Sequence, residues 1–268
     1  MAIADVSVII PTSHREQFLG EALESALRET SVAIEVIVVD DSAEGSARGV
    51  VERLSDPRVR YLGRGQPSWG CSGAVRNAGV PLATGRYLHF LDDDDVLEDG
   101  ALGSLARALD RTPSAAAAFG VIVPFGGSGP ELASEQRYWE EATQAARRVR
   151  TRVGLAARML FGKALLACSA CIVRREAFVG VGGFDEALDA CVDGDLYLRV
   201  IRRSGFVFLD QLVVHRRIGH LAVTRSTESH HRYQRAYLQI HRKYRGERGA
   251  VEFYALKMAV RFADLAPG

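Results

Sequence analysis

The stretch YLHFLDDDDVLEDG (residues 87–100) joins an apolar, aromatic run to four consecutive aspartates. A run that is almost continuously apolar, interrupted here by His89, is typical of a strand buried on both faces. If the backbone stays extended beyond it, Asp92 and Asp94 turn to one side and the other two aspartates to the opposite side. Like charges about 5 Å apart repel by roughly 3 kcal/mol at an effective dielectric constant near 20, and a divalent cation would reverse that balance.

Strands and helices alternate along the chain around this stretch. Strands are expected over 6–10, 34–40, 58–63, 86–91 and 115–125, with helices over 16–27, 47–54, 72–83 and 100–111. This alternation with short connections predicts an α/β fold with a Rossmann-like, mostly parallel sheet and helices on both faces. The later chain is less regular, with helix over 135–163 and 193–205, strands over 166–175 and 206–217, and two helices after residue 227.

Composition excludes some classes of protein. The 268 residues carry 34 basic and 33 acidic side chains, a balance that argues against a nucleic-acid partner. No run of about 18 apolar residues is present, and an acidic residue stands where a signal peptide needs a basic one, so we expect a cytoplasmic protein. The Ala, Arg and Gly content suggests a bacterial source.

The four cysteines include one CxxC motif, Cys168 and Cys171, in apolar surroundings. A structural zinc site would want a second pair or suitably spaced histidines, so buried reduced thiols are the favoured interpretation.

A second expected strand also ends in acids, Asp40 and Asp41. Ligands of open parallel sheets bind outside the carboxyl ends of the strands. Carboxylates there suit Mg²⁺ or Mn²⁺, which commonly binds one or two of them together with phosphates and water. The alternative for the aspartate run is a solvated acidic turn before a helix, with Asp99 near the helix N-terminus.

Five motifs in order, VSVIIPT, EVIVVDDS, AVRNAG, ATGRYLHFLDDDD and VGGFDEAL…VDGDLYLRV, resemble glycosyltransferase family 2 over residues 5 to about 226. The resemblance implies a GT-A fold and an inverting, metal-dependent transferase that uses Mn²⁺ or Mg²⁺. It also implies a nucleoside-diphosphate sugar donor, a UDP-sugar by preference, and an acceptor hydroxyl or amine on a small molecule, glycan or lipid-linked sugar. It divides the chain into a GT-A domain (1–226) and a C-terminal helical extension (227–268). The nucleotide-binding half would cover about 1–125 and the acceptor-side half about 126–226.

The resemblance also implies roles for single residues. Pro11 and Thr12 would lie along the base and ribose, and Asp41 would accept a hydrogen bond from uracil N3–H. Arg76 would approach the base or the phosphates, with Asn77 beside it.

The aspartate run matches the family's DxD motif. Asp92 would contact the ribose or the donor sugar, Asp93 belongs with the nucleotide-binding set, and Asp94 would hold the metal. Structural alternatives stay open: Asp41 as a turn cap and Arg76 as a surface arginine.

An inverting displacement places the general base opposite the leaving group, so a second, distant acid is expected. The segment DACVDGDLYLRV offers Asp193 as this base, with Asp189 a weaker alternative. Asp195 is interpreted instead as an acid at the helix N-terminus or as a salt-bridge partner of Arg199. Val192 stands where the family has glutamate, and the helix dipole in the first turn would lower the basicity of Asp193.

The segment HRRIGHLAVTRS (215–226) offers His215 and His220 as metal ligands, with Arg225 the preferred diphosphate contact and Arg216 and Arg217 further cations. Trp69 could stack on a sugar or base. The basic, aromatic tail favours packing or a homodimer, with peripheral membrane contact as the alternative.

Two other functions remain open. A nucleotidyltransferase would want a glycine-rich triphosphate loop after the first strand, which PTSHREQFL lacks. A non-catalytic sugar-nucleotide-binding protein is favoured by the departure at Val192.

Overall fold

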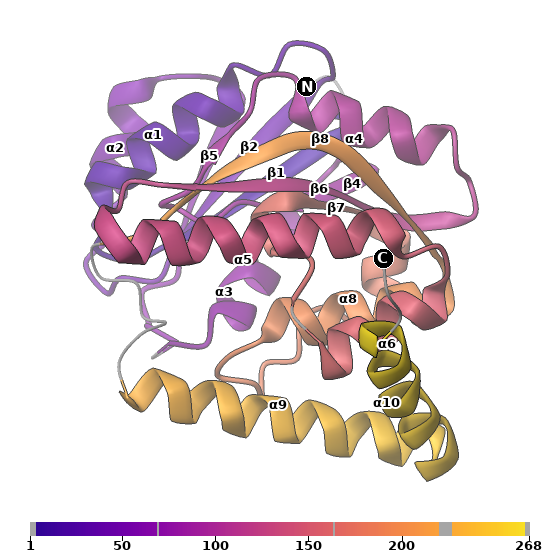
Figure 1. Cartoon of the computed structure of the whole chain (residues 1–268). Helices are drawn as coiled ribbons and strands as arrows, with labels where there is room; N and C mark the ends of the chain where they lie inside the picture. Colours follow the sequence, from indigo (N-terminus) through magenta and orange to yellow (C-terminus); the bar gives the residue numbers. More distant parts are fainter. Residues whose placement is uncertain (1–3, 69, 163, 220–226, 266–268) are drawn as a thin grey trace.

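One sheet organises the part of the chain that the computed structural model describes, residues 4–68, 70–162, 164–219 and 227–265 (Figure 1). Its strands are β1 Val6–Thr12, β2 Ile34–Asp40, β3 Val59–Gly63, β4 Tyr87–Phe90, β5 Val96–Leu97, β6 Ala115–Phe125, β7 Cys171–Arg174 and β8 Gly205–Arg217. They are hydrogen-bonded in the order β3-β2-β1-β4-β7-β6-β8-β5.

The sheet is mixed but mostly parallel, which confirms the expected fold class. Strands β1 to β4 run parallel to one another, and β6 and β8 form a second parallel pair. Strand β7 joins the two groups by pairing antiparallel with both β4 and β6. The two-residue strand β5 was missed from the sequence because it is too short to show a periodicity.

Helices cover both faces of the sheet. They are α1 Glu16–Leu27, α2 Arg48–Leu54, α3 Ser72–Gly79, α4 Ala101–Asp110, α5 Gly129–Arg148, α6 Arg152–Phe161, α7 Arg175–Gly180, α8 Val192–Arg203, α9 Thr227–Arg248 and α10 Ala250–Leu265, with 3₁₀ turns η1 Val80–Leu82 and η2 Cys168–Ala170. Figure 1 shows α1 and α4 on one side of the sheet and α3 and α8 on the other.

Close packing of α3 on the sheet brings its side chains to the strand ends. A Cβ atom at Gly79 would lie 2.9 Å from methyl groups of both Ile9 and Val39, so this position admits a glycine and little else. Strand β2, below the helix, is buried at every residue. Glycine at the end of the AVRNAG motif therefore lets Arg76 approach the carboxyl edge of the sheet.

The tail forms the two expected helices, α9 and α10, which pack on α6. The Tyr237 hydroxyl donates to the Met159 carbonyl over 2.8 Å, and the rings of Phe161 and Phe253 lie 5.0 Å apart. The division of the chain at residue 226 stays a prediction, as do a homodimer and membrane contact. Among the described helices, none combines the length and the apolar character needed to cross a bilayer.

Buried His89 on β4 predicts a pH dependence of stability. Burial lowers the pKa of His89 to about 4, against a hydrogen bond at 2.8 Å to the Cys171 carbonyl that raises it. The unfolded chain, with a histidine pKa near 6.5, therefore binds more protons between about pH 4 and pH 6.5. This residue's contribution is complete above about pH 6.5 and falls by roughly 3 kcal/mol as the pH drops to about 4.

The measurement is urea unfolding at pH 7.5 and pH 4.5 for the wild type and for His89→Gln. We expect a smaller loss of unfolding free energy in the variant between the two pH values. Equal losses in both proteins would contradict the assignment.

Candidate active site

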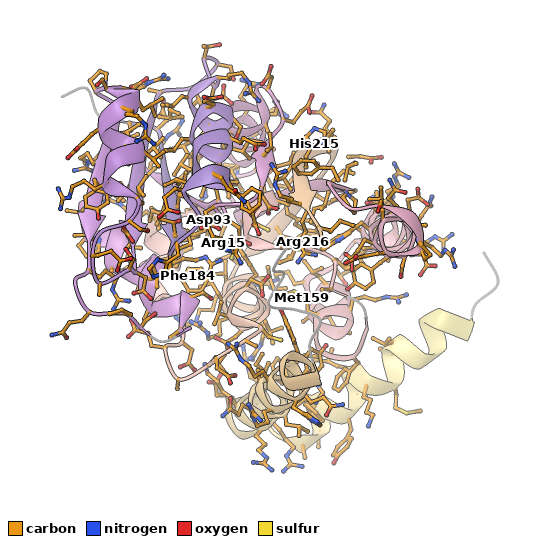
Figure 2. All side chains as sticks on the ribbon, turned by 90° about the vertical axis from the view of Figure 1, so that its left-hand side faces the viewer. Arg15, Asp93, Met159, Phe184, His215 and Arg216 are labelled. Atoms are coloured by element: carbon orange, nitrogen blue, oxygen red, sulfur yellow. The ribbon has the colours of Figure 1, made fainter. Side chains whose placement is uncertain are left out.

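The carboxyl ends of β1, β2 and β4 meet at one edge of the sheet, because the three strands are parallel neighbours. The aspartate run follows β4 at this edge, and the first turn of α8 faces it. Figure 2 shows Arg15, after β1, beside Asp93, with Arg216 of β8 close by. The site is thus assembled from the first strand, the last long strand and the connection between β4 and β5.

The four aspartates alternate in burial, although the run does not stay extended: the Asp95 N–H donates to the Asp92 carbonyl at 3.1 Å and closes a turn. Asp93 and Asp95 are buried, with 5% and 2% of their surface exposed. The side chains of Asp92 and Asp94 keep 37% and 24% of their surface accessible. Only the second pair can therefore meet a ligand directly.

The buried Asp93 holds strand β1 to the acidic run. Its carboxylate accepts the Thr12 hydroxyl at 2.7 Å and Arg15 Nη1 at 3.2 Å. Burial raises the pKa of Asp93 to about 7, although the charge of Arg15 opposes the shift. The structure thus places the Asp93 carboxylate, with the Thr12 hydroxyl, inside the fold, and the nucleotide contacts expected of both residues stay predictions. Pro11, by contrast, lies in register with Val39 of β2 and is half-buried.

The buried Asp95 holds strand β8 in the same way. Its Oδ1 accepts the backbone N–H of Arg217 at 3.0 Å. Burial, followed by the charges of Asp92 and Asp94, raises the pKa of Asp95 well above its usual range. The backbone N–H of Asp92 donates to the Ser169 hydroxyl, so a hydrogen bond to η2 also holds the aspartate run in place.

The two accessible carboxylates each face an arginine. Arg76 donates from Nη2 to Asp92, and Arg15 Nη1 lies 2.8 Å from Asp94 Oδ2. Arg76 is 7% exposed, and its Nε and Nη1 have no hydrogen-bond partner among the described residues. A buried guanidinium with unmet donors is costly unless an acceptor completes it. The alternative of an ordinary surface arginine is thus excluded for Arg76.

The accessible carboxylates fit a divalent cation held jointly with a ligand. Within the described ranges, no group of three or more His, Cys, Asp or Glu side chains is arranged to hold a metal ion. Mg²⁺ and Mn²⁺, however, are commonly held by one or two carboxylates plus phosphate oxygens and water. Burial, and next the charge of Asp92, raises the pKa of Asp94, and a bound cation would relieve this repulsion.

His215 does not join this set, which corrects the metal-ligand prediction. Its Nε2 lies 2.8 Å from Glu98 Oε2, and its ring packs edge-on against Phe125. Side chains alternate along β8, so the next residue, Arg216, turns to the other side and senses the charges of Asp95 and Asp92. Figure 2 likewise shows His215 apart from Arg216 and Arg15.

Asp193 lies in the first turn of α8, close enough to Asp92 to sense its charge. Burial raises the pKa of Asp193 above its usual value, and the negative charge of Asp92 raises it further. The hydrogen bond from the Gly194 N–H and the positive charges of Arg76 and Arg216 lower the pKa, but burial outweighs them. The expected decrease in basicity from the helix dipole is therefore wrong, because burial outweighs it. A carboxylate with a raised pKa is suited to accept a proton.

The neighbouring acids of this segment are engaged elsewhere. Asp195 is buried and accepts Arg199 Nε at 2.8 Å and Lys243 Nζ at 3.1 Å, which confirms the predicted salt bridge. Asp189 lies 3.7 Å from Arg232 and from Arg235 of α9.

Asp41 is capped by the loop that follows β3. It accepts the Ser68 N–H at 2.9 Å and the Ser68 hydroxyl at 2.7 Å, and Arg64 Nη1 at 2.5 Å. A nucleotide base at Asp41 would share these acceptor oxygens with Ser68. Trp69 of the same loop, and His220 and Arg225 after β8, lie outside the described residues, so their predicted roles stay predictions.

Two tyrosines near Asp193 were missed from the sequence. Burial, and then the charge of Asp193, raises the pKa of Tyr233 on α9 to about 12. Burial also raises the pKa of Tyr138 on α5, and the charge of Asp193 adds to this increase. Both helices were expected, but only the tertiary structure reveals which of their residues lie near Asp193.

Comparison with known proteins gives consistent matches. The family description "Glycosyl transferase family 2" matches residues 7–180. The succinoglycan biosynthesis protein ExoO of Rhizobium meliloti is 32% identical over 137 residues, which are 50% of this chain and 38% of the relative. A GalNAc(5)-diNAcBac-PP-undecaprenol beta-1,3-glucosyltransferase of Campylobacter jejuni is 36% identical over 104 residues, 38% of this chain and 33% of the relative. The matches thus span little more than a third of either relative.

Among solved structures, S. aureus TarS 1-349 in complex with UDP-GlcNAc aligns with a TM-score of 0.64 over 90% of this chain and 73% of that chain. The sequence identity is 18%, so this likeness shows the fold alone.

Proposed function

Because the chain belongs to glycosyltransferase family 2, we propose that it moves a sugar from a UDP-sugar to an acceptor hydroxyl or amine by an inverting, metal-dependent displacement. The carrying observation is that Asp92 and Asp94 are accessible at the carboxyl edge of the sheet and that Asp193 lies close enough to sense the charges of Asp92 and Arg76. A UDP-sugar is favoured because TarS was solved with UDP-GlcNAc. Cytoplasmic location stays a prediction.

The accessible aspartates and two arginines would hold the donor diphosphate. A Mg²⁺ or Mn²⁺ ion at Asp94, when bound, would neutralise negative charge on the departing nucleoside diphosphate. Arg76 has two N–H donors without a partner among the described residues, and Arg216 lies close enough to Asp95 and Asp92 to sense their charges. Both arginines would donate hydrogen bonds to phosphate oxygens. The ion pairs of Arg76 with Asp92 and of Arg216 with Glu135 would be exchanged for pairs with the ligand.

Asp193 would act as the general base on the other side of the sugar. Its carboxylate would take the acceptor proton while the acceptor oxygen or nitrogen forms a bond to the anomeric carbon. The bond from that carbon to the diphosphate oxygen breaks, and its electron pair leaves with the nucleoside diphosphate. Tyr138 and Tyr233 would line the acceptor side, since both lie near Asp193.

The acceptor class follows from the relatives rather than from this geometry. The Campylobacter jejuni relative is named for a diphosphoundecaprenol-linked acceptor. We therefore include lipid-linked sugars with glycans and small molecules as acceptors to be tried.

A thermal-shift panel tests the donor. We expect UDP with Mn²⁺ at about 100 times its Kd to stabilise the protein by about 2.7 kcal/mol, or roughly 5 °C in Tm. GDP and dTDP should give smaller shifts, and EDTA should remove most of the UDP effect. A panel in which no nucleotide shifts Tm, or in which EDTA changes nothing, would contradict the proposal.

A further inference from the structure

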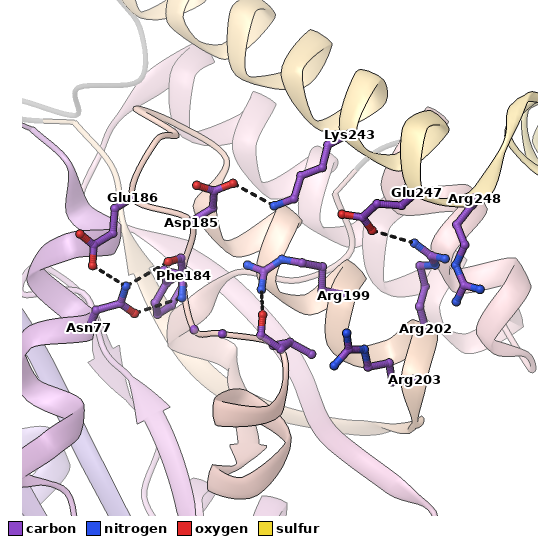
Figure 3. Close-up of a pocket in the computed structure, with 13 residues that line it drawn as sticks. Asn77, Phe184, Asp185, Glu186, Arg199, Arg202, Arg203, Lys243, Glu247 and Arg248 are labelled. Carbon is purple, nitrogen blue, oxygen red and sulfur yellow. Dashed lines mark hydrogen bonds and ion pairs between the residues drawn. The ribbon is translucent and has the colours of Figure 1, made fainter.

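A cavity of about 650 Å³ lies between α8, α9 and the turn that follows α7 (Figure 3). Its lining includes Asn77 of α3, Asp185 and Glu186 before α8, Arg202 of α8, and Lys243 and Arg248 of α9. Neither Asp193 nor any residue of the aspartate run contributes to it. The cavity is therefore separate from the donor site, although Asn77 directly follows Arg76 on α3.

The described lining carries five basic and three acidic side chains. Lys243 is paired with Asp185 at 2.8 Å, and Arg199 donates to Asp195 and to the Val181 carbonyl. Glu186 accepts a hydrogen bond from Asn77. The charged side chains at the end of the cavity nearest α3 therefore have partners within the protein (Figure 3).

The other end of the cavity has an excess of positive charge. Arg202, Arg203 and Arg248 extend toward it from α8 and α9 (Figure 3). The acid beside them is Glu247, whose carboxylate lies 3.9 Å from Arg202 Nη1 and is half exposed. One partly solvated carboxylate therefore stands against three guanidinium groups.

Arg202 is the strongest indication of a missing anion. Its side chain is 9% exposed, and its Nη2 has no hydrogen-bond partner within the described ranges. The guanidinium carbon lies 4.2 Å from the centre of the Tyr244 ring, which holds the group in place by a cation–π contact. A fixed, buried guanidinium with an unmet N–H is costly, and an oxyanion at the cavity would satisfy it.

We propose that this cavity binds a phosphate or diphosphate group, carried by a soluble organic phosphate or by a lipid headgroup. Guanidinium groups bind phosphate oxygens through paired N–H donors. Arg202 and Arg248 line this end, and Arg203, which donates from Nη1 to the Gly180 carbonyl, adds a third positive charge. The volume exceeds that of a bare phosphate, so the group would be part of a larger molecule. Binding here requires neither a divalent cation nor a sugar donor, so it is testable apart from the proposed transferase activity.

The first test is calorimetric titration of the full chain with inorganic pyrophosphate in EDTA. We expect saturable binding that weakens about tenfold in Arg202→Gln and in Arg248→Gln, because each removes charged hydrogen-bond donors. The matched control is Arg245→Gln, an exposed arginine of the same helix that does not line the cavity. Its affinity should equal that of the wild type.

Undiminished binding in both cavity variants, or an equal loss in Arg245→Gln, would overturn the proposal. Circular dichroism reports whether each variant is folded. If Arg202→Gln is not, the exposed Arg248→Gln carries the test.

The second test distinguishes a lipid headgroup from a soluble organic phosphate as the source of the bound phosphate group. Sedimentation is measured with vesicles of phosphatidylcholine alone and with phosphatidylglycerol added. Co-sedimentation that depends on phosphatidylglycerol and is reduced in Arg248→Gln but not in Arg245→Gln assigns a lipid headgroup. Pyrophosphate binding without vesicle binding assigns a soluble phosphate, and failure of both probes overturns the inference.

Discussion

The Asp193→Asn variant is expected to lose about 1000-fold in kcat while it keeps the donor affinity of the wild type. The substitution removes the proton acceptor, and general-base catalysis typically contributes about 100- to 10,000-fold. The side chain keeps its size, and the hydrogen bond that Asp193 accepts in the described structure comes from the neighbouring Gly194 N–H, not from an arginine proposed to hold the diphosphate. The measurement is acceptor-dependent release of UDP from the donor, corrected for acceptor-free hydrolysis, together with calorimetric titration of UDP in Mn²⁺.

Asp189→Asn is the matched control. It removes a carboxylate from the same segment, but one that is 46% exposed and 3.7 Å from two arginines of α9. We expect kcat within about twofold of the wild type. A loss of turnover in Asp189→Asn with normal turnover in Asp193→Asn would show that the base is assigned to the wrong aspartate. A wild type that binds UDP but shows no turnover with any acceptor would favour the non-catalytic alternative.

The Asp94→Ala variant is expected to bind Mn²⁺ and UDP together at least about 10- to 100-fold more weakly. Changes to groups that merely support metal ligands already cost about that much, and Asp94 is proposed as a direct ligand. In EDTA the difference should vanish or reverse, since the variant removes a negative charge from the place where the diphosphate would lie. Calorimetric titration of UDP with and without Mn²⁺ measures both effects.

Asp99→Ala is the control for this experiment. Asp99 belongs to the same acidic segment, but its side chain is 70% exposed and pairs with Arg28 at 2.8 Å. Its removal should leave UDP binding unchanged in either condition. Identical titrations for Asp94→Ala and the wild type in Mn²⁺ would remove the metal from Asp94.

Much of the fold could be predicted because helix and strand periods are local properties of the sequence. The helix over 16–27 was predicted to the residue, and β2 likewise matches its predicted range of 34–40. The place of β7 could not be predicted, because antiparallel pairing with both β4 and β6 depends on packing between distant segments.

At the site, too, local features of the sequence could be predicted, whereas contacts between distant segments could not. The sequence by itself determined that acidic residues would follow parallel strands. It did not determine why Asp92 and Asp94 stay accessible, because the run is not extended but forms a turn closed by the Asp95 N–H and the Asp92 carbonyl. It also determined the pair between Asp195 and Arg199, which are four residues apart on one helix.

Only the tertiary structure decided which groups these acids meet. The pairing of β8 with β5 turns His215 toward Glu98 and leaves Arg216 on the side of the aspartates. Burial made Asp193 a stronger base than its place in a helix predicts. The arrangement of Arg202 with Arg248 likewise arises where α8 and α9 pack together. Such distances and burials join residues far apart in the chain, and no local pattern of the sequence encodes them.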